Sequence, residues 1–248
     1  MDESFDRIRD AYEAGELETA MALTKRHLAR HSDDGRVWEL AGLIHYAAGE
    51  FARSVSAIER ASLHIPLRPA ARVCLGHGYG KLGKRQLARD LLVQLIRDES
   101  ISVPLLLQVA AGLDAVEQPT QALQACRRAA ERDPQHAQAY YDMGYYAARC
   151  GYEPRYTESL ARKAIALAPD NVCFRVGLAA HLFRLERTRE AYDVVQNLTN
   201  EQIEAISCSC CLKKIVSVYE AEGDYRRVIL CRQQLLQIEI QGLEPDCE

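Results

Sequence analysis

The sequence repeats itself at an interval of 34 residues. Two columns of small residues follow this step: Ala20, Ser54, Ala88 and Ala122 in one, and Gly42, Gly76, Ala110 and Gly144 in the other. A third column consists of Gly15, Gly49 and Gly83. Because three independent columns share one step, the chain is predicted to be a tandem array of similar units. Such units bury their apolar faces only by stacking on their neighbours.

Each unit is predicted to contain two helices. In the second unit, Trp38, Ala41 and His45 recur at helical spacing. Gly49 then accepts the left-handed conformation that ends many helices. A second helix follows and ends before Pro66, since proline cannot continue it. The small columns lie where the two helices should cross closely, and a large side chain there would overpack the crossing at a cost of ~1–3 kcal/mol.

The columns set the boundaries of the units. We expect one all-α domain over residues 1–248 with about 14 helices, in seven units at 1–34, 35–68, 69–102, 103–136, 137–171, 172–205 and 209–242. The fifth unit carries one extra residue, and three extra residues precede the seventh. Because the seven units fill nearly the whole chain, no room is left for a separate catalytic domain.

These columns resemble the pattern of the tetratricopeptide repeat (TPR) family, in which an aromatic residue precedes Leu-Gly, Tyr, Gly, Ala and Pro at set steps. The matching residues are Trp38, Gly42, Gly49, Ala61 and Pro66 in one unit, and Leu75, Gly76, Tyr79, Gly83 and Ala88 around the next. The resemblance covers nearly the whole chain. It implies a right-handed α-solenoid of antiparallel helix pairs, whose concave groove is lined by the first helices and holds a peptide or helix of a partner protein.

The resemblance also places particular first-helix residues in that groove. The expected partner-binding residues are Leu43, Tyr46, His77, Lys81, Leu107, Tyr141, Tyr145, Arg149, Phe183 and Arg184. Tyrosine and arginine are over-represented at binding hot spots, so we expect a peptide with apolar anchors and an acidic residue. The alternative for each tyrosine is packing between helices, since tyrosine is intermediate in burial.

Two functions from different classes are compatible with this pattern. The favoured one is a non-enzymatic adaptor, scaffold or chaperone-like module that binds a protein segment. The alternative is a structural protein that forms a homo-oligomer through its groove or its C-terminal end, because only eight residues follow Ile240 to cover the last helix. Family members that clamp a C-terminal carboxylate use a Lys-Asn pair one helical turn apart, and the matching places here hold other residues, namely Phe5 and Arg9, Glu39 and Leu43, or Val73 and His77.

Composition argues against several other classes. The net charge is −4, with 31 basic and 35 acidic residues, so nucleic acid is not an expected partner. No apolar run reaches the length of a membrane span, and residues 1–16 lack a signal-peptide core. An odd number of cysteines, nine, indicates free thiols in a reducing compartment, and we expect a cytoplasmic protein.

Two short motifs are weighed against a packing role. Gly78, Gly83 and Lys84 fit a phosphate loop, but a helical pattern precedes them and Arg85 replaces the required Ser or Thr. Gly78 and Gly80 are not explained by the repeat, and Gly80 is expected to face the groove.

The second motif is a CxxC formed by Cys208 and Cys211, with Cys210 between them. A zinc site needs four ligands, and no further Cys or His lies close by in the sequence. We therefore expect small packing residues here, with no metal, no cofactor and no catalytic residues in the chain.

Overall fold

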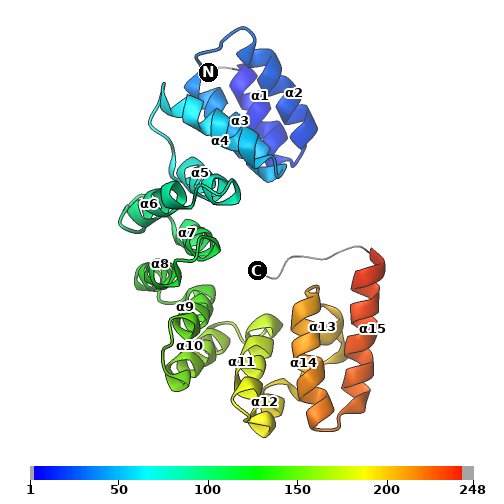
Figure 1. The fold of residues 1–248 in the computed structure, drawn as a ribbon. Helices are drawn as coiled ribbons and strands as arrows, with labels where there is room; N and C mark the ends of the chain where they lie inside the picture. The colour runs from blue at the N-terminus through cyan, green and yellow to red at the C-terminus, as the bar shows by residue number, and fades with distance from the viewer. Residues whose placement is uncertain (1–2, 242–248) are drawn as a thin grey trace. The chain divides into compact units, whose positions relative to one another are not determined.

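The computed structural model describes residues 3–241, and these form 15 helices and no strand. The helices follow one another as antiparallel pairs (Figure 1), which confirms the all-α, solenoid-type class. The chain divides into two compact units, Met1–Asp133 and Pro134–Glu248. Gly242, the last residue of the predicted seventh unit, lies outside the described residues. No described helix combines the length and the apolar character needed to cross a membrane.

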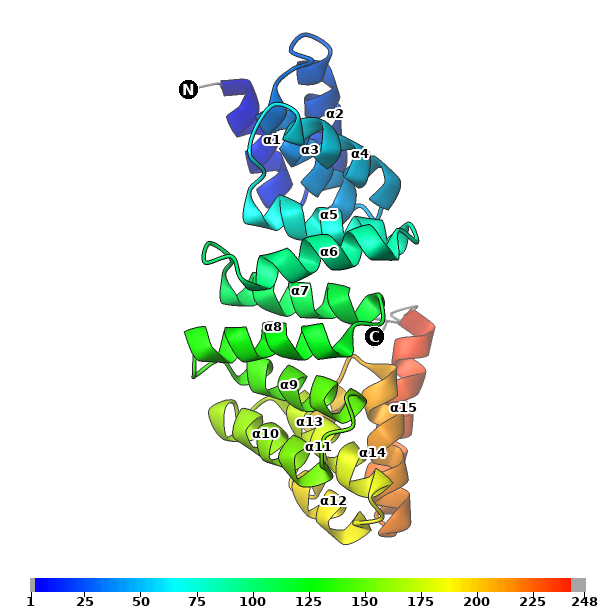
Figure 2. The same cartoon turned by 60° about the vertical axis from the view of Figure 1, so that its left-hand side comes forward.

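The first compact unit contains four helix pairs. They are α1 (Glu3–Glu13) with α2 (Leu17–Leu28), α3 (Gly35–Ala47) with α4 (Phe51–Ser62), α5 (Pro69–Lys81) with α6 (Arg85–Ile96), and α7 (Val103–Ala115) with α8 (Pro119–Arg132). Each helix contacts the next, and α1, α3, α5 and α7 also contact one another in turn. The helices from α5 to α8 lie in a stack (Figure 2). The first helices therefore form one layer of this unit.

The second compact unit contains three pairs and one additional helix. They are α9 (Ala137–Arg149) with α10 (Pro154–Leu167), α11 (Val172–Arg184) with α12 (Thr188–Val195), the short α13 (Asn200–Glu204), and α14 (Ser209–Ala221) with α15 (Tyr225–Gln241). The estimate of about 14 helices is thus one too low. Thr199 begins α13 with a capping box, in which its hydroxyl accepts from the Gln202 N–H at 3.2 Å and its own N–H donates to the Gln202 side chain at 3.1 Å. This cap stabilises a separate helix beyond the end of α12.

A residue in the left-handed conformation ends the first helix of each pair. Five of these residues are glycines with φ between 73° and 77°: Gly15, Gly49, Gly83, Gly151 and Gly223. Glu117 (φ 64°) and Glu186 (φ 62°) adopt the same conformation. Glu117 lies 34 residues after Gly83, so the same left-handed turn forms at this repeat position with glutamate in place of glycine.

The columns of small residues lie at buried crossings within the pairs. A Cβ atom on Gly76 would lie 2.6 Å from Leu92 Cδ2, and one on Gly42 would overlap Ile58. Ser54 is fully buried and donates its hydroxyl to the Gly42 carbonyl at 2.8 Å. Close approach of the two helices therefore explains why these positions are small, as the repeat predicted.

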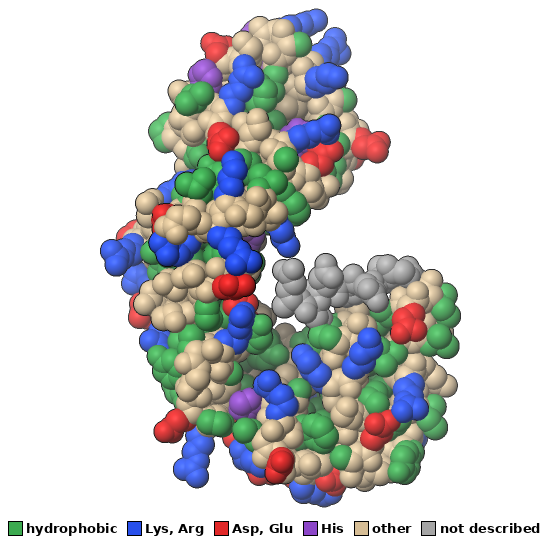
Figure 3. Space-filling model, in the orientation of Figure 1, with side chains coloured by type: hydrophobic (Ala, Val, Ile, Leu, Met, Phe, Trp, Pro, Cys, Tyr) green, Lys and Arg blue, Asp and Glu red, His purple; other side chains and the backbone are tan. Residues whose placement is uncertain are grey.

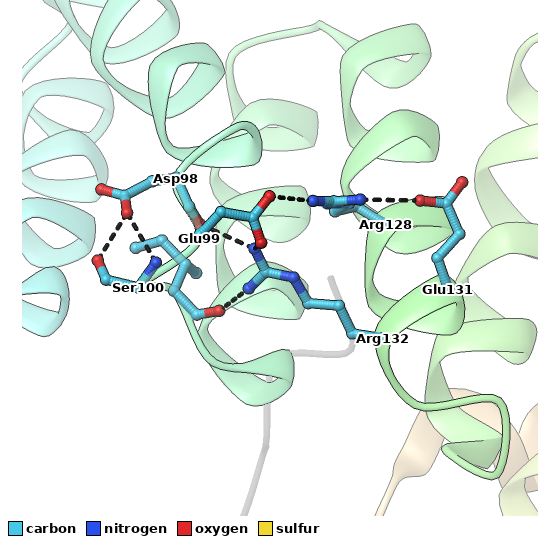
Figure 4. Close-up of polar contacts among 7 residues, drawn as sticks. Asp98, Glu99, Ser100, Arg128, Glu131 and Arg132 are labelled. Carbon is cyan, nitrogen blue, oxygen red and sulfur yellow. Dashed lines mark hydrogen bonds and ion pairs between the residues drawn. The ribbon is translucent and has the colours of Figure 1, made fainter.

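Polar contacts fasten the loop between α6 and α7 to α8 (Figure 4). Asp98 Oδ1 accepts from the hydroxyl of Ser100 at 2.6 Å and from its N–H at 2.9 Å. These bonds to Ser100 are the main reason that the pKa of Asp98 falls to about 2. Arg132 donates to the Asp98 carbonyl and to the Glu99 carboxylate, both at 3.0 Å, and Arg128 also pairs with Glu99. These contacts give polar groups of the loop partners within the protein, and they fix where α7 begins.

Candidate functional site: exposed faces of the first helices

In the first unit, Tyr46 and His77 bind each other. The Tyr46 hydroxyl lies 2.9 Å from His77 Nδ1, and His77 Nε2 lies 2.8 Å from the Gln108 carbonyl. A carbonyl can only accept, so Nε2 carries the proton and Tyr46 donates to Nδ1. Burial lowers the pKa of His77 and raises the pKa of Tyr46 to about 12. These two predicted groove residues thus form an internal link between α3, α5 and α7.

The other three predicted residues of the first unit differ in exposure. Leu43 is half-buried and packs against a core cluster that includes Val55 and Leu75. Leu107 is also half-buried, whereas Lys81, the last residue of α5, is exposed. The structure therefore brings Tyr46 and His77 together and leaves Lys81 as the most accessible of the five.

In the second unit, Tyr141 packs between α9 and α11. Its ring stacks on Phe174, with centroids 4.7 Å apart and an interplanar angle of 29°. A Cβ atom on Gly177 would overlap the Tyr141 hydroxyl, so glycine makes room for this ring. Burial raises the pKa of Tyr141. The contacts of Tyr141 are therefore those of a tyrosine packed between helices, which was the alternative to a role in partner binding.

Tyr145 and Arg149 lie one turn apart on the exposed face of α9. Tyr145 is 47% exposed, and its ring meets Tyr146 edge-on at 5.1 Å between centroids. The Arg149 guanidinium lies 6.0 Å from the Tyr145 ring centroid, within the range of a cation–π contact. This side of α9 therefore presents an aromatic ring and a cation to solvent.

Asp142 lies beside this pair and was not predicted as a site residue. It precedes Tyr145 by three residues and accepts from the Gln138 amide at 2.7 Å. Burial raises the pKa of its carboxyl to about 6. The signal in the sequence was the spacing of Gln138, Asp142, Tyr145 and Arg149, which places all four along one side of a helix.

The remaining predicted residues end α11. Phe183 is half-buried and packs against the core of the second unit, and Arg184 is exposed at the last position of the helix. Both compact units carry basic and acidic side chains mixed over the visible surface (Figure 3). No single sign of charge therefore dominates the visible face of either unit.

A hollow of about 460 Å³ lies elsewhere in the second unit, between α10, α11 and α12. Its lining includes Arg162, Ile165, Arg175, Leu178 and Glu190. The Arg175 guanidinium donates to the Val194 carbonyl at 2.9 and 3.1 Å. None of the ten predicted residues lines this hollow.

The glycines of the phosphate-loop-like motif have packing roles. The motif begins inside α5, which continues to Lys81. A Cβ atom on Gly78 would lie 2.5 Å from Val55 Cγ2 of α4, and one on Gly80 would lie 3.2 Å from Val116 Cγ1. The contact with Val116, at the end of α7, gives Gly80 a packing role that the repeat had not explained.

Within residues 3–241, seven cysteines are free thiols: Cys74, Cys126, Cys150, Cys173, Cys210, Cys211 and Cys231. Cys208 is disulfide-bonded, so the expectation of free thiols throughout is wrong at this residue.

Comparison with solved structures relates this fold to known proteins. The C-terminal part of a TPR repeat-containing protein from Cytophaga hutchinsonii matches 97% of this chain and 100% of its own length, with a TM-score of 0.65 and 12% identity. YrrB, described as a TPR protein with an unusual peptide-binding site, matches 73% of this chain and 90% of its own, with a TM-score of 0.58 and 22% identity.

MamA from Desulfovibrio magneticus covers 69% of this chain and 98% of its own, with a TM-score of 0.58 and 16% identity. Neither a family model nor a curated protein sequence matches the chain. The likeness in helix order and packing establishes that this chain has the fold of the TPR proteins.

Proposed function

We propose that this protein is a non-enzymatic adaptor that binds an extended or helical segment of a partner protein on the exposed faces of its first helices. The TPR-like fold supports this class of function, since stacked helix pairs provide extended binding surfaces.

The observation that carries the proposal is the exposed face of α9. Tyr145 and Arg149 are residue types found at binding hot spots, and Tyr145 is 47% exposed although it is a large aromatic side chain. Asp142 adds a carboxylate that burial makes costly to charge. A partner segment could place an apolar side chain on Tyr145, an acidic group at Arg149 and a basic group at Asp142.

Selection from a phage-displayed library of random peptides tests the proposal. Peptides selected on the purified protein should lose at least ~10-fold in affinity for Tyr145→Ala, which is the effect of removing ~1.4 kcal/mol of binding energy. Tyr152→Ala is the matched control, because Tyr152 is 44% exposed but lies after α9 in the turn to α10. Equal affinity of the selected peptides for both variants would contradict the proposal.

Self-assembly is the second candidate, and one feature of α15 favours it. Four large apolar residues on this helix are exposed: Tyr225 (67%), Ile229 (58%), Leu236 (54%) and Ile240 (70%). Their spacing of four, seven and four residues places them on one side of the helix. Such a stripe is typical of a helix that packs against another polypeptide.

Sedimentation velocity over a range of protein concentrations tests this candidate. An oligomer that dissociates in the double variant Ile229→Lys/Leu236→Lys would support it. A chain that stays monomeric at every concentration would exclude it.

A further inference from the structure

A hollow of about 280 Å³ lies between α1 and α2 in the first unit. Its charged and polar lining side chains are Ser4 and Arg7 of α1, Arg26 and His27 of α2, and Arg30 and His31 of the turn that follows. No carboxylate of the described residues lines it. Its volume is just below the ~300–1,000 Å³ typical of pockets for drug-sized ligands, so it suits a small anionic group.

The three arginines of this hollow make no contact with a carboxylate. Within residues 3–241, the side chains of Arg7, Arg26 and Arg30 form neither an ion pair nor a hydrogen bond. Elsewhere in the same unit arginines pair with acidic residues, as Arg72 does with Asp98 at 2.5 Å. Like charges gathered around one hollow repel one another, and an anion bound there would relieve the repulsion.

The histidine at the base of the hollow is held in place by other groups. His27 is 6% exposed, and its Nδ1 lies 3.0 Å from the Ser4 hydroxyl. Its Nε2 donates to Asp34 at 3.2 Å, since a carboxylate can only accept. Asp34 also accepts from two backbone N–H groups at the start of α3. This carboxylate is therefore bound to groups other than the three arginines.

Helix dipoles and packing do not account for all of these cations. Arg26 lies in the last turn of α2, where the helix dipole favours a positive charge. Arg7 lies in the second turn of α1, beyond the reach of such an effect. Two and three repeat steps later, Leu75 and Val109 are buried apolar residues. A cation thus occupies a position that packs the core in other repeats.

We propose that this hollow binds the dianion of a phosphate group through Arg7, Arg26 and Arg30. A phosphate monoester carries about −1.5 to −2 charges at pH 7 and three acceptor oxygens, whereas a carboxylate has one charge and two oxygens. Guanidinium groups match phosphate oxygens with paired N–H donors. The site uses α1, α2 and the turn after α2, and it does not depend on peptide binding at α9.

NMR titration of the ¹⁵N-labelled full chain with inorganic phosphate tests the site. We expect saturable chemical-shift changes within residues 4–7 and 23–31, larger than those caused by chloride at the same ionic strength. A short phosphoserine peptide is titrated in parallel to identify the source of the group. Tighter binding of the peptide supports a phosphorylated polypeptide, and tighter binding of inorganic phosphate supports free phosphate. Changes no larger than those with chloride for both probes would overturn the proposal.

Arg26→Gln and Lys25→Gln separate the hollow from general attraction by positive charge. Both residues are exposed neighbours on α2, but only Arg26 lines the hollow. Arg26→Gln should weaken phosphate binding by at least ~10-fold, as expected for the loss of charge-assisted hydrogen bonds. Lys25→Gln should weaken it by ~2-fold or less, because solvent and salt screen a charge outside the site.

Arg7→Gln provides a second test from the other helix. It should weaken phosphate binding as much as Arg26→Gln does, since both arginines line the hollow. Circular dichroism should match that of the wild type for all three variants, because none of the replaced side chains has an ion-pair partner within residues 3–241. Equal phosphate affinity of Lys25→Gln and the two arginine variants would overturn the proposal.

Discussion

His77 in the first unit and Tyr145 in the second occupy the same position in their repeats, two steps of 34 residues apart, but their surroundings differ. His77 has both ring nitrogens in hydrogen bonds, to Tyr46 and to Gln108. Tyr145 is 47% exposed and contacts Tyr146 and Arg149 of its own helix. One repeat position thus holds an internal link in one unit and an accessible aromatic in the other.

The next repeat accounts for much of this difference. Gln108 is the sixth residue of α7, and its carbonyl accepts a hydrogen bond from the Nε2–H of His77. The sixth residue of α11 is Gly177, and its surface is covered by the Tyr141 hydroxyl. The position in a repeat therefore fixes where a residue lies on its helix. Contacts with the neighbouring helix then determine whether its side chain remains accessible to a partner.

The largest expected effect comes from filling the space at Gly177. Gly177→Ala should lower the free energy of unfolding by about 2 kcal/mol, because the new methyl group displaces the Tyr141 ring from Phe174. Urea unfolding followed by circular dichroism measures the loss. In a Tyr141→Phe background, which lacks the overlapping hydroxyl, the same change should cost less, and an equal cost would show that Tyr141 is not held there.

Removing the link at His77 should have a smaller effect. His77→Leu should lower the free energy of unfolding at pH 7.5 by about 1–2 kcal/mol, since it leaves Tyr46 and the Gln108 carbonyl without their partner. Burial lowers the pKa of His77 below its ordinary value of 6.5. The unfolded chain therefore binds more protons, and this contribution is complete above pH 6.5 and is lost as the pH falls. As the pH falls below 6.5, the free energy of unfolding should decrease more steeply for the wild type than for His77→Leu. Equal slopes for the two proteins would contradict this assignment.

Asp142 should show the opposite dependence in the second unit. The folded pKa of about 6 lies above the ordinary 3.8, so the native state binds the proton more tightly, and stability falls as the pH rises from about 4 through 6. Asp142→Asn should therefore raise the free energy of unfolding at pH 7.5 by about 1–2 kcal/mol. The gain should vanish in urea titrations at pH 4, and a gain that persists there would point to a cause other than charge.

The smallest effect on stability is expected at Tyr145. Tyr145→Ala should change the free energy of unfolding by less than ~0.5 kcal/mol, as is usual for exposed positions, while it weakens binding of selected peptides. Thermal unfolding of this variant beside Tyr152→Ala checks the point. A loss above ~1.5 kcal/mol would indicate that Tyr145 is a packing residue like Tyr141.

The fold was largely readable from the sequence because the repeat fixes helix ends through local chemistry. The left-handed conformation of Gly15, Gly49 and Gly83 ends a helix at each position, and it can be predicted from the glycine itself without knowledge of distant contacts. The short helix α13 was missed although Thr199 and Gln202 carry its capping box, because the predicted sixth unit, 172–205, was expected to contain only two helices.

The site was less readable because accessibility depends on contacts between repeats. The sequence identified Tyr141 and Tyr145 together, and only the neighbouring helix distinguishes them: Phe174 and Gly177 enclose the first and leave the second exposed. Such pairings follow from stacking geometry, which a list of repeat positions does not contain.

Hydrogen exchange of the full chain with and without a library-selected peptide tests the central claim most directly. If the accessible face of α9 is the binding surface, the peptide should slow exchange within residues 137–149 and leave the His77-bearing helix α5 unchanged. Protection confined to α10 and α12, or to α5, would contradict the account.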